Sequence, residues 1–198
     1  MDIPEPFVGI IQMQYKASTL SNTEELTNFF NACFKELIRV LNIHNYQVRA
    51  AKTGKMFEYA FWYLIKQKYD FNMERDVELK RACMSRGGKL DFGVFKKGET
   101  PSENTVICGI EAKGSEPNSS KRPALVRTDT IKKAIANAYL FKKIYPKLPF
   151  FIVTNVLPKS GNSKCMMNVA ENDIVSKFID VTNAQDLRQF VDTIKGLQ

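Results

Sequence analysis

The sequence predicts an α/β fold in which helices cover a mixed central sheet. Two observations favour this class. Segments with apolar residues every three to four positions alternate with short segments of period two, which are typical of helices and strands respectively. Their order along the chain is helices, three strands, a helix, a strand, and then a strand and a helix, which favours an α/β sandwich. With 198 residues, the chain fits one compact domain over 1–198.

The helices are predicted from capping signals and apolar spacing. A capping-box pattern begins at Ser21, and apolar residues follow it at helical spacing to about Leu41. The same spacing predicts further helices over residues 52–68, from Thr128 or Asp129 to the prolines at 146 and 149, and over residues 184–194. The aromatic residues of the helix at 52–68 are expected in the core rather than stacked on bases.

Alternating or continuous apolar runs predict the strands. We expect strands near residues 7–13, 77–83, 89–95, 105–113, 150–156 and 174–181. Residues 96–104, 114–126 and 157–172 are expected to form loops.

The residues with the clearest chemistry lie on two of these strands. Asp91 belongs to the strand at 89–95, and Glu111 and Lys113 end the strand at 105–113. A period of two makes Glu111 and Lys113 project from one face, about 6.8 Å apart at Cα, with Ala112 turned into the packing. Two carboxylates with an open side suit Mg²⁺, and the carbonyl of Ala112 would add a third oxygen.

Such an arrangement is typical of phosphodiester hydrolysis. A divalent cation neutralises the negative charge that builds up on the phosphate and lowers the pKa of its bound water. Lys113 would orient that water or stabilise the developing oxyanion. The alternative is a pair of surface ion pairs, with Glu111 bound to Lys113 and Asp91 bound to Lys89.

Glu58 is a fourth candidate. It lies one helical step from Phe61 and Trp62 and therefore points toward the buried side of its helix. A carboxylate there needs a partner or a function. It would either stabilise a basic neighbour or assist the metal site.

These residues carry a resemblance to a known family. The chain resembles the PD-(D/E)XK nuclease superfamily, and most of all a type II restriction endonuclease. The matching residues are Glu58 on an early helix, Asp91 in Gly-Lys-Leu-Asp-Phe-Gly-Val, and Glu111-Ala112-Lys113 at the end of an apolar strand. The resemblance covers a core from about residue 54 to 156. Leu90 stands where the family name has proline.

The resemblance implies a restriction-endonuclease-like α/β/α sandwich, Mg²⁺ dependence and cleavage of duplex DNA to 5′-phosphate ends. It implies metal binding by Asp91 and Glu111 and a catalytic role for Lys113. Glu58 matches the acid often found on the first core helix of the family.

The charge distribution favours a polyanionic partner. Between Lys113 and Lys164 there are eleven basic and two acidic residues, a balance of +9 against +8 for the whole chain. This quarter of the chain therefore carries the entire basic excess, which predicts a cationic face. The residues expected to contact DNA phosphates are Arg86, Lys89, Lys121, Arg122, Arg127, Lys132 and Lys133.

Other patterns exclude several classes. The chain has no run of eighteen apolar residues, so no membrane span is expected, and its N-terminal residues do not resemble a secretory signal. Four scattered cysteines without CxxC spacing predict reduced, mostly buried thiols in a cytoplasmic protein. The single histidine, His44, lies in a polar stretch, which argues against a histidine-based mechanism.

The sequence thus predicts a Mg²⁺-dependent, sequence-specific endonuclease that acts on double-stranded DNA, as a homodimer because a palindromic site has a twofold axis. Two alternatives stay open within DNA metabolism: a repair or recombination nuclease of junction-resolvase type, and a small subunit that needs a second subunit for recognition. A non-catalytic DNA-binding module is the alternative from another class.

Overall fold

A five-stranded mixed sheet forms the centre of the molecule. The computed structural model describes residues 3–118 and 122–198. The strands are β1 (Met73–Val77), β2 (Leu90–Phe95), β3 (Val106–Ala112), β4 (Phe150–Thr154) and β5 (Lys177–Asp180), and they lie in that order across the sheet. Strand β2 pairs antiparallel with both β1 and β3, whereas β4 pairs parallel with both β3 and β5. The predicted α/β class with a mixed sheet is confirmed.

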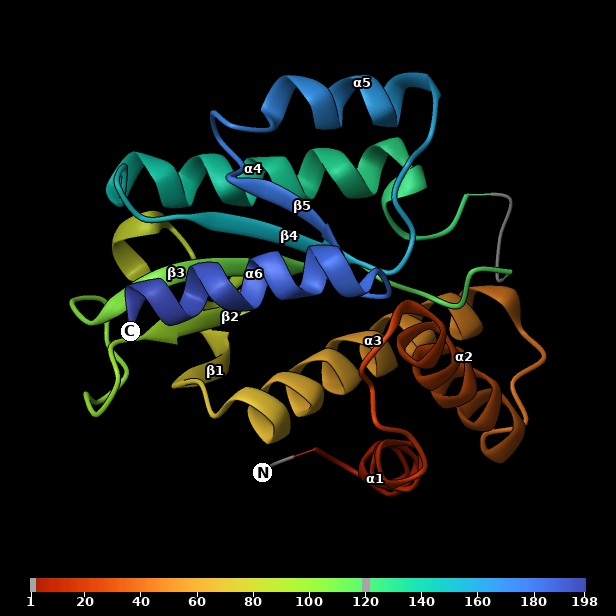
Figure 1. Ribbon diagram of the computed structural model, residues 1–198. Helices are drawn as coiled ribbons and strands as arrows, with labels where there is room; N and C mark the ends of the chain where they lie inside the picture. Colours follow the sequence, from red (N-terminus) through yellow and green to blue (C-terminus); the bar gives the residue numbers. More distant parts are fainter. Residues whose placement is uncertain (1–2, 119–121) are drawn as a thin grey trace.

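Helices cover both faces of this sheet (Figure 1). On one face lie α4 (Thr128–Ile144) and α5 (Gly161–Ala170). On the other lie α3 (Tyr46–Tyr69) and α6 (Ala184–Leu197), with α2 (Thr23–Val40) and α1 (Phe7–Lys16) packed against α3. Among the described residues, no helix is both long and apolar enough to cross a bilayer.

Capping side chains set where two of the helices begin. Asn22 accepts a hydrogen bond from the backbone N–H of Glu25 at 2.9 Å, and the Glu25 carboxylate accepts one from the N–H of Ser21 at 2.8 Å. These two bonds fix the start of α2, with Asn22 and Glu25 in the places predicted for Ser21 and Glu24, so the cap lies one residue later than expected. Asn45 caps α3 in the same way, so this helix begins at Tyr46 rather than near residue 52.

Two segments differ in type from the prediction. Residues 7–13 belong to the helix α1, whose buried residues Phe7, Ile10 and Ile11 follow helical spacing against α2 and α3. Residues 161–170, predicted as loop, form α5, which buries Ser163, Met167 and Ala170 at the same spacing. In both cases a short amphipathic helix is stabilised by its neighbours, and its weak local pattern was misread.

The first strand is displaced. Strand β1 ends at Val77, and the residues that follow form a 3₁₀ turn at Lys80–Ala82. The apparent alternation of Leu79 and Cys83 therefore arises from a turn in which Leu79 is buried and Cys83 is exposed. Cys33 and Cys108 are buried as expected, whereas Cys165 is also exposed.

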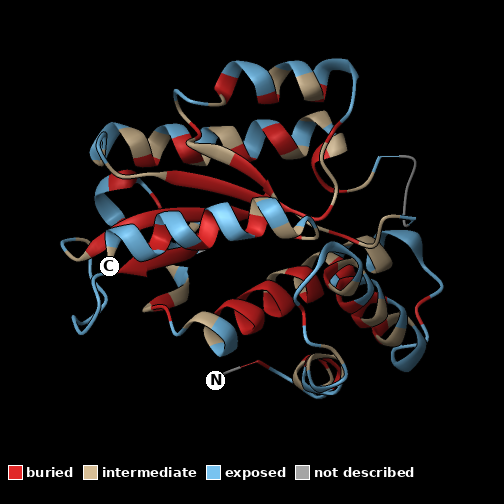
Figure 2. Ribbon diagram, in the orientation of Figure 1, coloured by how far each residue is buried: buried red, intermediate tan, exposed pale blue. Residues whose placement is uncertain are grey.

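Apolar side chains fill the space on each side of the sheet (Figure 2). Phe61 of α3 contacts Phe92 of β2, with ring centroids 5.5 Å apart, and Phe141 of α4 contacts Phe150 of β4 at 5.3 Å. The aromatic residues of α3 from Phe57 to Tyr63 are buried, which confirms their prediction as core. Helices thus pack against both faces of the sheet, and the Phe61–Phe92 contact lies next to Asp91 of the candidate site.

Candidate active site

The antiparallel pairing of β2 with β3 determines which side chains meet. Phe92 pairs with Ile110 and Gly93 pairs with Gly109. Continuing this register sets Asp91 opposite Glu111, so both carboxylates project from the same face of the sheet. Lys113 lies two positions beyond Glu111 and therefore shares that face.

Lys113 joins the two acids. Its Nζ lies 2.9 Å from Asp91 Oδ2 and 2.6 Å from Glu111 Oε1, and it donates to the Ala112 carbonyl at 3.1 Å. Asp91 Oδ2 also accepts the backbone N–H of Ala112 at 2.8 Å. Three oxygen atoms from three neighbouring residues therefore converge on one ammonium group.

The sheet holds this end of β3 in place. The N–H of Lys113 donates to the carbonyl of Val153 at 2.9 Å, and the Thr154 hydroxyl donates to the carbonyl of Lys113 at 2.7 Å. Both the N–H and the carbonyl of the Lys113 backbone are thus hydrogen-bonded to β4. The position of its side chain is consequently set by the parallel half of the sheet as well as by β2.

Burial changes the acid–base properties of this group. Glu111 is only 3% exposed, and burial, together with the nearby Asp91 charge, raises its pKa to about 7. Burial by itself would lower the pKa of Lys113, but the adjacent Glu111 and Asp91 charges raise it above its usual value. The acids thus favour the charged form of Lys113, whereas burial and the Asp91 charge favour the protonated form of Glu111 more than in an exposed glutamate.

Glu58 faces the same group from α3. Its carboxylate is bound by Lys55 one helical turn earlier, at 2.6 Å. Burial and the negative charge of Asp91 raise the pKa of Glu58. Glu58 therefore pairs with a basic neighbour, as one of its two interpretations predicted, and it lies close enough to Asp91 to interact with it electrostatically. Its role at a metal site stays a prediction.

The donor set fits a hard divalent cation. The possible donors are the carboxylates of Asp91 and Glu111 and the backbone carbonyl of Ala112. Within residues 3–118 and 122–198, no group of three or more His, Cys, Asp or Glu side chains could hold a metal ion. Mg²⁺ is usually held by one or two carboxylates, with water and substrate oxygens completing its shell. In the described part of the chain, the buried Glu111 Oε2 has no hydrogen-bond partner, which leaves one more oxygen for a cation.

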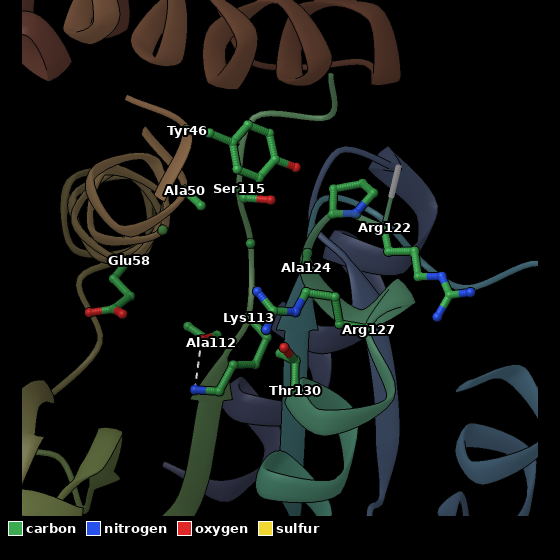
Figure 3. A pocket seen from close by; sticks show the side chains of 13 residues that line it. Tyr46, Ala50, Glu58, Ala112, Lys113, Ser115, Arg122, Ala124, Arg127 and Thr130 are labelled. Carbon is green, nitrogen blue, oxygen red and sulfur yellow. Dashed lines mark hydrogen bonds between the residues drawn. The ribbon is translucent and has the colours of Figure 1, made fainter. Parts of the chain in front are cut away.

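A pocket of about 190 Å³ opens beside Lys113 (Figure 3). Its walls come from the first half of α3, the segment after β3 and the start of α4. Glu58 and Lys113 line it, together with Arg122 and Arg127. Two of the predicted phosphate-contacting residues therefore border the same pocket as the candidate catalytic lysine.

Glycine 114 allows the segment after β3 to lie close to α3. A Cβ atom at Gly114 would stand 2.1 Å from the ring of Phe57, and one at Gly54 would lie 3.6 Å from the Gly114 carbonyl. Any side chain at residue 114 would therefore push α3 and β3 apart. A bidentate ion pair from Arg49 to Glu116, at 2.7 and 2.8 Å, ties the same segment to α3.

The other predicted DNA contacts are more dispersed. Arg86 and Lys89 precede β2. Arg86 is exposed, whereas Lys89 is half-buried and is paired with Glu78 at 2.9 Å. Lys132 and Lys133 are exposed on α4, and Lys132 lines the hollow between α4 and α5 rather than the pocket beside Lys113. Lys121 lies outside the described residues.

The sequence prediction missed several residues of the site. Asn137 of α4 donates to Glu111 Oε1 at 3.0 Å, and Asn155 bonds both backbone groups of Ser115. Tyr46 and Ser115 line the pocket. Only Asn137 had a recognisable signal, because it is a polar residue three positions after Ala134, on the edge of the apolar side of its helix.

Comparisons with protein families, with curated proteins and with solved structures find no match to this chain. The interpretation of the site therefore depends on its own geometry and chemistry.

Proposed function

We propose that this protein is a Mg²⁺-dependent endonuclease that hydrolyses double-stranded DNA at specific sequences to 5′-phosphate ends, on a restriction-endonuclease-like fold. The observation that carries the proposal is the convergence of Asp91, Glu111 and the Ala112 carbonyl on one cationic position, with Lys113 attached to all three. This is the set of groups that metal-assisted phosphodiester hydrolysis requires.

Asp91, Glu111 and the Ala112 carbonyl would hold the cation, which when bound supplies positive charge to the phosphate and lowers the pKa of water. The Lys113 ammonium stands between these oxygens and would leave that position when the cation binds. A short movement of the Lys113 side chain would then keep its positive charge close to the cation and to the phosphate that is cut.

The basic surroundings support a nucleic-acid substrate. Arg122 and Arg127 border the pocket, and the chain segment that follows β3 carries the whole basic excess of the protein. Dimerisation belongs to the same proposal, because one active site cuts one strand and a duplex break needs two.

The test is cleavage of supercoiled and linear DNA of mixed sequence, with Mg²⁺ or with EDTA. Wild-type protein is expected to give discrete bands only with Mg²⁺, and Glu111→Ala and Lys113→Ala are expected to give none. Lys35→Ala, which changes an exposed lysine of α2 away from the site, is the matched control and should cut like wild type. DNA binding without cleavage by any protein would instead indicate a binding module or a subunit that lacks its partner.

A further inference from the structure

The pocket beside Lys113 is too small for most organic ligands. Its volume is about 190 Å³, whereas small-molecule sites usually measure about 300–1,000 Å³. Most of its polar lining can donate hydrogen bonds or carries positive charge, from Tyr46, Lys113, Ser115, Arg122, Arg127 and Thr130. A single anionic group matches this size and lining.

Ser115 has a buried hydroxyl group that a ligand in this pocket could satisfy. It is 7% exposed, and its hydroxyl has no hydrogen-bond partner within the part of the chain that the structure describes. Its backbone is fixed on both sides by Asn155, which accepts from the Ser115 N–H at 3.1 Å and donates to its carbonyl at 2.8 Å. A buried hydroxyl held in place without a partner is unfavourable, so an acceptor oxygen entering the pocket would gain from bonding to it.

The side chains around Ser115 favour a negative charge. In Figure 3 the hydroxyl groups of Tyr46 and Ser115 point to the same side of the pocket, and the Glu58 carboxylate points away from Ser115. Arg127 extends along the pocket and is held at 2.8 Å by Asp129 in the first turn of α4. The positive end of this 17-residue helix lies at the same wall.

We propose that this pocket binds the DNA backbone phosphate next to the one that is cut, with the Ser115 hydroxyl donating to a phosphate oxygen and Arg127 supplying charge. The choice of ligand rests on the proposed function. Ser115 is two residues from Lys113, so their Cα atoms are at most about 7 Å apart. Successive phosphates of one strand rise by about 3.4 Å along the helix axis and also turn about it, so their separation in space is larger than this rise and comparable with the spacing of the two residues.

The test is a binding measurement in EDTA, where no cleavage occurs. Backbone amide NMR spectra would be recorded while the protein is titrated with inorganic phosphate, and separately with a short duplex of mixed sequence. Both ligands are expected to shift the amides of residues 114–116 and 128–130 most. Ser115→Ala should weaken phosphate binding about tenfold, the usual effect of one hydrogen bond to a charged group.

Ser115→Ala is expected to fold like wild type, because the lost hydroxyl makes no hydrogen bond within the described structure. Thr193→Ala is the matched control, since this exposed hydroxyl of α6 bonds only to its own helix at Gln189. Its phosphate affinity should equal that of wild type.

Three results would overturn the proposal: equal phosphate affinity in Ser115→Ala and wild type, shifts centred on Lys132 and Lys133 instead, or phosphate shifts that the duplex does not reproduce. Because the measurement needs no metal, it separates the two proposals. Binding through Ser115 in a protein that does not cut DNA would show that the pocket binds a backbone phosphate, and would remove only the assignment of that phosphate to a position next to a cut.

Discussion

Replacing Lys113 with methionine removes the ammonium that joins the two acids while keeping an unbranched side chain of similar length. In the wild-type protein this ammonium lies 2.9 Å from Asp91 and 2.6 Å from Glu111. Without it, the two carboxylates face each other across β2 and β3 with no cation between them. The substitution should therefore destabilise the metal-free protein.

The size of the loss follows from burial. Removing one partner of a buried ionic group costs about 3–5 kcal/mol of unfolding free energy. The Lys113 side chain is 21% exposed, and Glu111, with its pKa already raised to about 7, can take up a proton in the variant. Both effects favour the lower end of this range of unfolding free energy, about 3 kcal/mol. For a chain of this length, that loss corresponds to a fall in Tm of about 6–12 °C.

Thermal unfolding followed by circular dichroism, in EDTA and in Ca²⁺ or Mg²⁺, would measure this. A divalent cation should stabilise Lys113→Met more than wild type, because in the variant it need not displace the ammonium. Lys35→Met, at an exposed position of α2, controls for the loss of one lysine. An unchanged Tm in EDTA, or a cation effect that is larger in wild type, would refute the idea that Lys113 occupies the cation position.

Three further outcomes are expected. The pKa of Glu111 is raised from 4.5 to about 7, so the folded protein binds this proton more tightly than the unfolded chain does. The metal-free protein should therefore lose unfolding free energy as the pH rises from about 4.5 to about 7. Urea unfolding at a series of pH values should show this loss, and Glu111→Gln should remove it. Asn137→Leu deletes the hydrogen-bond donor to Glu111 and should raise the pKa of Glu111 further. It should also weaken Mg²⁺ binding by about tenfold, as measured by calorimetry. An unchanged Mg²⁺ affinity would contradict a supporting role for this amide. Gly114→Ala sets a Cβ 2.1 Å from the ring of Phe57 and should cost at least about 2–3 kcal/mol in chemical denaturation, whereas Gly196→Ala, with open space in α6, should be neutral or stabilising.

The sequence by itself determined the α/β class and the strands that carry the candidate site. Strands β2 and β3 were predicted to within a residue or two, because period-two alternation and continuous apolar runs are local properties of the chain. Asp91, Glu111 and Lys113 were predicted as site residues from their chemistry, their places on two strands and the family resemblance, and the structure brings these three together.

Only the tertiary structure decided how these residues are arranged and supported. The register between β2 and β3 sets Asp91 opposite Glu111, and no local pattern specifies a register. The contacts from Asn137, Asn155 and Arg49 to the site span 26, 40 and 67 positions of the sequence, so no local pattern reveals them. Burial follows from the same packing, and it is burial that raises the Glu111 pKa and leaves the Ser115 hydroxyl without a partner in the described structure.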